Sequence, residues 1–157
     1  MPRRAAATLR PVEPDPVHRS KLVTQVINKV MLDGKKSTAE RIVYDALAII
    51  AERTGKDPLE QLEASVKTLT PVLEVRSRRV GGANYQIPFP VQGHRQYHFA
   101  FSWLVQSARA RSGMPYEQRL AAEIVDAYNQ AGAAFKKKED THKMAEANRA
   151  FAHFART

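Results

Sequence analysis

Residues 72–91 form two runs of alternating character that carry the arginines Arg76, Arg78 and Arg79 and the aromatic residues Tyr85 and Phe89, a composition that suits RNA better than a core. Two alternating runs flank the pair Gly81-Gly82, and two residues free to take positive φ are what a two-residue β-hairpin turn requires. With this turn, Arg78 lies opposite Tyr85 and on the same face as Arg76. Guanidinium groups bind phosphates and an aromatic ring stacks on a base, so the segment predicts an RNA-binding arm. A solvated edge hairpin with incidental charge is the alternative.

The same register makes the second face of the arm polar and places Arg79 on it. Arg76 then lies opposite Ile87. Pro88 and Pro90 lack the backbone N–H that a central strand would use, which places the second strand at an edge or a bulge. The pattern therefore favours a projecting two-stranded arm.

Residues 34–38 imitate the end of a phosphate-binding P-loop, where a lysine and a hydroxyl hold nucleotide and metal. That loop needs another glycine five positions earlier, where this chain has Lys29, and a strand before it, where a helix is expected. A basic turn between two helices is the better interpretation.

His94 and His98 are four residues apart, a spacing that could hold zinc on one face of a helix. The chain has no cysteine, and nothing in the sequence brings a third ligand near. No serine stands in a Gly-x-Ser-x-Gly elbow either. We expect no metal, no cofactor and no catalytic residue, and therefore not an enzyme.

The net charge of +9 is segregated along the chain. Lys and Arg against Asp and Glu number 8 and 3 over residues 1–36, 4 and 6 over 37–70, 6 and 1 over 71–111, 1 and 3 over 112–132, and 6 and 3 over 133–157. Three basic segments separated by acidic ones are typical of a protein with one face toward a polyanion. A membrane surface is a weaker interpretation, because the basic residues do not follow one amphipathic helix.

The length of 157 residues predicts one domain with a core of its own. The lack of cysteine suits a reducing compartment, with the cytosol as the default. The longest apolar runs are too short to span a bilayer, and the N-terminus lacks the apolar run of a secretory signal. We therefore expect a soluble, cytoplasmic protein with no membrane partner.

Hydrophobic periodicity predicts a mainly α fold, one domain of about six helices with a protruding two-stranded β-hairpin arm at 72–91. Residues 1–19, rich in proline and arginine, are expected to form an extended basic N-terminal arm before the helical domain, 20–157. A capping box at 37–40 is expected to open the second helix. The expected helices cover 20–32, 37–55, 57–71, 97–111, 115–132 and a sixth that lies beyond the lysines 136–138 and contains 144–154.

Three segments, 33–44, 74–88 and 137–154, closely resemble the ribosomal small-subunit protein seven family of bacterial and plastid type. The similarity covers essentially the whole chain. The resemblance implies a helical domain with a protruding hairpin that binds 16S ribosomal RNA and nucleates assembly of the subunit head. It also implies a place near the messenger RNA exit path, the exit-site tRNA and proteins of families nine and eleven, in the cytoplasm or the plastid stroma.

The RNA contacts that the resemblance implies fall on basic residues in the termini, the first inter-helix turn and the arm. They are Arg3, Arg4, Arg10, Lys35, Lys36, Arg76, Arg78, Arg79, Lys136, Lys137, Lys138, Lys143 and Arg149. To these we add Tyr85 of the arm and three residues around the fourth helix, Arg95, Arg109 and Arg111. The chain departs from the family at Ser102, where an arginine usually precedes the tryptophan, and at 92–94, usually more basic and proline-containing.

Two other classes remain as alternatives. A basic helical DNA-binding protein commonly places one polar-faced helix in the major groove. Here the basic residues are expected in turns, an arm and the termini, which suits irregular RNA. An enzyme ranks third, because no polar side chains converge on a site. Which nucleotides are contacted, and whether the protein represses its own messenger RNA, are left open by the sequence.

Overall fold

The computed structural model describes residues 10–155, so the predicted contacts Arg3 and Arg4 lie outside the described residues. Six α-helices, one 3-10 helix and one two-stranded antiparallel hairpin follow each other along this part of the chain. Their bounds are α1 Lys21–Val30, α2 Lys36–Thr54, α3 Pro58–Leu69, β1 Leu73–Val80, β2 Ala83–Pro90, α4 His94–Ala110, α5 Tyr116–Tyr128, α6 Gly132–Ala147 and η1 Arg149–Ala155. The mainly α fold with a hairpin arm is confirmed.

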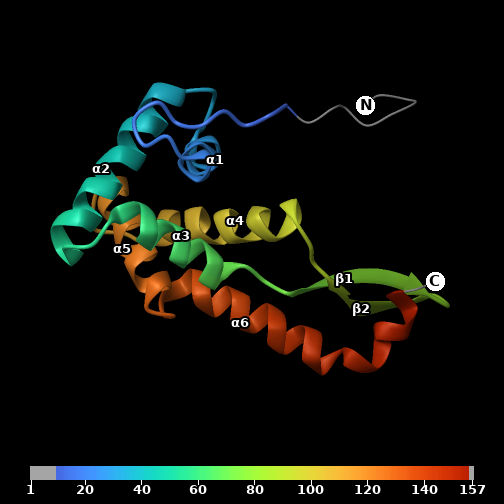
Figure 1. Ribbon diagram of the computed structural model, residues 1–157. Helices are drawn as coiled ribbons and strands as arrows, with labels where there is room; N and C mark the ends of the chain where they lie inside the picture. The colour runs from blue at the N-terminus through green and yellow to red at the C-terminus, as the bar shows by residue number, and fades with distance from the viewer. Residues whose placement is uncertain (1–9, 156–157) are drawn as a thin grey trace.

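The helices α1 to α5 pack into a body, and the hairpin extends from it alongside α6 (Figure 1). Helix α5 contacts α2, α3 and α4, which places it at the centre of the body. The core is apolar, and its largest fully buried side chains include Ile27, Leu47, Leu62, Leu104 and Leu120, from five different helices. Burial of such a side chain stabilises a fold by about 1.5–3 kcal/mol, so the predicted helical stripes hold the body together.

Four apolar residues that continue the hydrophobic periodicity of the last three predicted helices are exposed, namely Tyr97, Tyr128, Met144 and Ala147. Tyr97 lies in the first turn of α4 and Tyr128 is the last residue of α5, where each helix runs out of the body. Met144 lies near the end of α6, which extends beyond the body along the hairpin (Figure 1). At these helix ends the hydrophobic periodicity of the sequence continues, but no neighbouring element among residues 10–155 covers the side chains.

The signals at the start of α3 and at the end of α2 behave as predicted. The Asp57 side chain accepts a hydrogen bond of 3.0 Å from the backbone N–H of Leu59, and Pro58 opens the helix. Gly55 ends α2 in the left-handed conformation, at φ 64°. Both are local signals, since an N-cap carboxylate and a left-handed glycine satisfy backbone groups of their own helix end.

Other predicted boundaries are wrong. The capping box at 37–40 does not form, because α2 already begins at Lys36 and its N-cap, Lys35, makes no side-chain cap hydrogen bond. Gly132 does not close the fifth helix but opens α6, so the lysines 136–138 lie inside α6. A Cβ at Gly132 would come within 3.0 Å of the Asp126 Cβ, so this glycine permits a close approach of α6 to α5. The last predicted stripe, 144–154, is divided between α6 and η1.

Residues 10–20 contain no α-helix or strand, yet Asp15 anchors them to α2. Asp15 is buried and accepts hydrogen bonds from the Tyr44 hydroxyl, at 2.6 Å, and from the backbone N–H groups of Val17 and His18. The bond to this carboxylate, followed by burial, raises the pKa of Tyr44 to about 12. The predicted N-terminal arm is thus attached to the body at residue 15.

Candidate nucleic-acid interface

The hairpin has the register that its turn predicts. Gly81 and Gly82 both have positive φ, at 58° and 90°. Arg78 pairs with Tyr85, and Arg76 pairs with Ile87. Two neighbouring residues at positive φ strongly favour glycine, so these two glycines determine which residues share a face.

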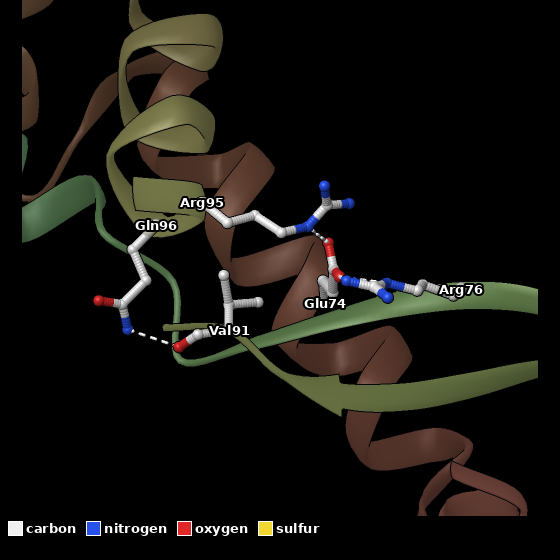
Figure 2. A network of polar contacts seen from close by, with 5 residues as sticks. All are labelled: Glu74, Arg76, Val91, Arg95 and Gln96. Atoms are coloured by element: carbon white, nitrogen blue, oxygen red, sulfur yellow. Dashed lines mark hydrogen bonds and ion pairs between the residues drawn. The ribbon is translucent and has the colours of Figure 1, made fainter. Parts of the chain in front are cut away.

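A buried carboxylate holds the base of the arm against α4. Glu74 is 3% exposed, and its Oε2 accepts a 2.7 Å hydrogen bond from the Nε of Arg95. Its Oε1 pairs with Arg76 (Figure 2). Each guanidinium also lies 5.0 Å from an aromatic ring, Arg76 over Phe89 and Arg95 over Phe99. These two predicted RNA contacts therefore have partners within the protein, and they set the direction of the arm.

The C-terminal helix η1 covers one face of the outer half of the arm. The Tyr85 ring lies 5.0 Å from that of Phe151 and 5.7 Å from that of Phe154, between centroids. Arg78 donates from Nη1 to the Phe154 carbonyl oxygen at 3.0 Å. The tip of the arm therefore has apolar neighbours on this face, and Figure 1 shows η1, in red, beside the hairpin.

The opposite face of the arm is open. It carries the exposed side chains of Ser77, Arg79, Asn84 and Gln86. Arg79 makes no hydrogen bond or ion pair with any described residue, so its guanidinium is available to a phosphate. The geometry thus leaves the Arg79 face, rather than the Tyr85 face, open to an anionic partner.

The four predicted lysines of α6 divide in the same way. Lys136, Lys137 and Lys143 are exposed and have no ion pair with the residues that the structure describes. Lys138 is half-buried, donates to the Thr68 carbonyl of α3, and has its pKa lowered by burial. After α6, Arg149 forms an exposed pair with Glu146 at 3.4 Å. Lys136, Lys137 and Lys143 are therefore the open cations of α6.

At the other end of the body, the turn between α1 and α2 exposes Lys35 and Lys36. Lys36 lies 3.7 Å from Glu40, an exposed pair one helical turn away that holds it only weakly. Arg109, at the end of α4, is exposed and donates from Nη2 to the Val30 carbonyl at 3.1 Å. These three cations remain able to meet an anion.

Arg111 instead completes a structural ion pair. Its Nε lies 2.7 Å from the Oε2 of Glu123, a carboxylate that is 0% exposed, and its Nη2 pairs with Asp126. Glu123 also accepts a 2.8 Å hydrogen bond from the Ala134 N–H at the start of α6. Glu123 therefore joins the end of α4 to α5 and α6 from inside the body.

A basic and aromatic surface between α1 and α4 was missed from the sequence. Shallow cavities there are lined by Lys21, Lys29, His94, Tyr97 and His98, among others. Tyr97 is 46% exposed, so its ring is available for stacking beside these cations. The signal in the sequence was the basic and aromatic residues near the ends of two predicted helices. The helical period of the apolar residues, however, predicts that Tyr97 is buried.

Of the two departures from the family pattern, the segment 92–94 borders this surface, since Gly93 and His94 line its cavities. Ser102 is buried within α4, so it does not offer an external contact. Gly93 precedes α4 at φ 56° and ψ −129°, a conformation that favours glycine and turns the chain from the arm into the helix. Among residues 10–155, no group of three His, Cys, Asp or Glu side chains could hold a metal, and no helix is long and apolar enough to cross a membrane.

Comparisons with known proteins identify the family of the chain. The family model for "Ribosomal protein S7p/S5e" matches residues 2–149. The protein named "Small ribosomal subunit protein uS7" of Carboxydothermus hydrogenoformans is 60% identical over 154 residues, which is 98% of this chain and 99% of the relative. Proteins of the same name from Dictyoglomus turgidum and Thermotoga petrophila are 57% and 59% identical, and the matches cover 98% and 97% of this chain and 99% and 98% of those relatives.

Proposed function

The chain belongs to the ribosomal protein S7p/S5e family, and on this premise we propose that it is a structural constituent of the small ribosomal subunit that binds 16S ribosomal RNA. The observation that carries the proposal is the 60% identity to a small-subunit protein over nearly the full length of both chains. Its role in this proposal is structural, without catalysis. The DNA-binding alternative is not supported, because the relatives are named as ribosomal proteins.

The finer part of the proposal concerns place and partners. The protein nucleates assembly of the subunit head, near the messenger RNA exit path and the exit-site tRNA, beside proteins of families nine and eleven. It works in the cytoplasm, or in the stroma if the source is a plastid. The resemblance of the arm and of the C-terminal segment to this family supports these neighbours.

The proposed binding mechanism follows from the division of the cations. Arg79, Lys35 and the lysines Lys136, Lys137 and Lys143 have exposed charges and neutralise phosphates, whose counterions are then released. Arg95 and Arg111 pair with buried carboxylates and hold the arm and the helices in position. Arg10, Arg109 and Lys36 are exposed and extend the basic surface around the body.

Chemical footprinting on full-length 16S ribosomal RNA tests the proposal. We expect the purified protein to protect a compact set of backbone positions in one region of that RNA, and to leave 23S ribosomal RNA, at equal phosphate concentration, without a localised footprint. The 23S RNA is the matched control, since it offers the same charge and the same helical geometry. Equal and diffuse protection of both RNAs would contradict the proposal.

A further inference from the structure

A cavity of about 440 Å³ opens between the end of α1, the start of α2 and the start of α5. Its apolar wall is formed mainly by Val30, Met31, Leu32, Ile42 and Tyr116. Cavities of about 300–1,000 Å³ with apolar walls and a few polar groups are typical of small-molecule sites. This one has room for a purine or a pyrimidine ring.

The rim of the cavity is cationic. Lys35 and Arg109 line it together with one carboxylate, Asp33, and the exposed Lys36 follows directly in the chain. The side chain of Lys35 has no partner among the described residues. Arg109 donates to the Val30 carbonyl and also interacts with the Tyr116 hydroxyl, and others of its five N–H donors remain free. A ligand with an apolar group inside the cavity and an anionic group at its rim could therefore bind the free donors of Lys35 and Arg109.

The wall of the cavity also offers two groups that a flat ring could contact. Leu32 is 60% exposed at its edge. The Tyr116 hydroxyl is buried beside Arg109, and the interaction between them partly offsets the rise in the pKa of Tyr116 that burial causes. A nucleobase has an apolar face that could cover Leu32, and it has donors and acceptors along its edge that could bond to the Tyr116 hydroxyl.

We propose that this cavity receives one unstacked nucleobase of the bound RNA, with the phosphate of that nucleotide held by Lys35 and Arg109. This inference rests on the proposed function. Sequence-specific RNA recognition commonly uses splayed bases that enter protein pockets. An acidic peptide would also suit the rim, but the net charge of +9 on the chain favours a polyanion as the occupant.

A steric variant tests the pocket. Thr38 is exposed and lines the cavity, so Thr38→Trp adds an indole at the cavity without a change in charge. Ser37→Trp is the matched control, because it adds the same group to the neighbouring exposed residue of the same helical turn, outside the lining. The probe is a 16S ribosomal RNA transcript of Carboxydothermus hydrogenoformans. Dissociation constants and base reactivity toward dimethyl sulfate and a carbodiimide are measured, and thermal melting confirms that both variants fold.

A second pair tests the apolar wall without added bulk. Leu32→Ala removes the exposed side chain at the edge of the cavity, and Val17→Ala, at a residue that is 64% exposed and outside the lining, is its control. We expect Thr38→Trp to weaken RNA binding about 10- to 100-fold, the effect of losing one stacked base. Leu32→Ala should weaken it several-fold, and both should deprotect the same base while the controls bind as the wild type does.

Two results would overturn the inference, and they are distinguishable. If the wild type does not bind the transcript, the proposed function and the nucleobase pocket both fail. If the wild type binds, but Thr38→Trp and Leu32→Ala leave the affinity and every base reactivity as in their controls, only the nucleobase pocket fails.

Discussion

The rings of Tyr85 and Phe151 lie 5.0 Å apart between centroids, so the outer half of the hairpin and the C-terminal 3-10 helix form one structural unit. The hydrogen bond from Arg78 to the Phe154 carbonyl reinforces this unit. The arm therefore leaves the body with one face already covered by the protein, and only its Arg79 face is free for a partner.

Phe151→Ala should loosen the outer hairpin without unfolding the body. An aromatic pair contributes about 0.5–1.5 kcal/mol beyond its burial, and this one lies outside the core. We expect faster amide hydrogen exchange around Tyr85 and a nearly unchanged melting temperature. Met144→Ala, at an exposed residue of α6, is the control. Equal exchange in the two variants would show that η1 does not brace the arm.

Arg111→Met should destabilise the whole domain by about 3–5 kcal/mol, because it leaves the fully buried Glu123 carboxylate without its cation. Urea denaturation measures this loss. Arg53→Met is the control, since Arg53 is exposed and has no ion pair with a described residue, and it should change stability by no more than about 0.5 kcal/mol. A similar effect of both substitutions would mean that Arg111 does not support the core.

Stability should fall at acid pH in part through His142. Its Nε2 accepts a 3.2 Å hydrogen bond from the Val72 N–H, which requires the neutral ring. Burial, followed by the charge of Lys138, lowers the pKa of His142 from 6.5. The unfolded state therefore binds a proton first, so this stabilisation is complete above about pH 6.5 and is lost as the pH falls from there toward the lower folded pKa.

The measurement is the urea midpoint at pH 7.5 and at pH 5.5 for the wild type and for His142→Gln. His98, whose pKa is also lowered, first by burial, contributes to both proteins and cancels in the comparison. We expect the wild type to lose more stability than the variant across this range. An identical loss in both would exclude His142 as a contributor.

The open cations should determine the salt dependence of RNA binding. We consider a triple variant in which Arg79, Lys136 and Lys137 are all replaced with Gln. The slope of log affinity against log salt should become about 2 to 3 less negative, since each phosphate contact contributes roughly 0.7–0.9 to its magnitude. The melting temperature should not fall, because these side chains have no partner among the described residues.

The control for this variant replaces three other exposed cations with Gln and so removes the same charge. These are Arg41, Arg53 and Lys56, which lie along α2 and just after it. We expect their replacement to leave the slope close to that of the wild type. If both triple variants make the slope less negative to the same extent, net charge rather than these positions drives binding.

Much of the fold could be predicted from local signals in the sequence. Gly81-Gly82 fixes the hairpin register, and Asp57-Pro58 fixes the start of α3, because in each case the decisive contact is made within a few residues. The helical stripes likewise identified most core residues of α1 to α5, although they also included the exposed residues Tyr97 and Tyr128. Gly132 was misassigned, since a glycine at a helix boundary serves an end or a beginning equally well, and its neighbours across the fold decide.

The division of the predicted contacts into open and paired cations could not be predicted from the sequence. Arg95 of α4 pairs with Glu74 at the base of the arm, and Arg111 at the end of α4 pairs with Glu123 of α5. Such pairs depend on tertiary placement, and the sequence shows only that the charges exist. The residues that the family resemblance implies as RNA contacts thus remain predictions, and the geometry ranks Arg79, Lys136, Lys137 and Lys143 first.

The most direct test of the account is a competition experiment. A labelled 16S ribosomal RNA transcript is bound to the purified protein at physiological salt, and unlabelled duplex DNA or unlabelled transcript is added at equal phosphate concentration. We predict that the unlabelled transcript displaces the label and that the DNA leaves most of it bound. Displacement by duplex DNA as effective as that by the transcript would contradict the claim that this protein is built to bind small-subunit ribosomal RNA.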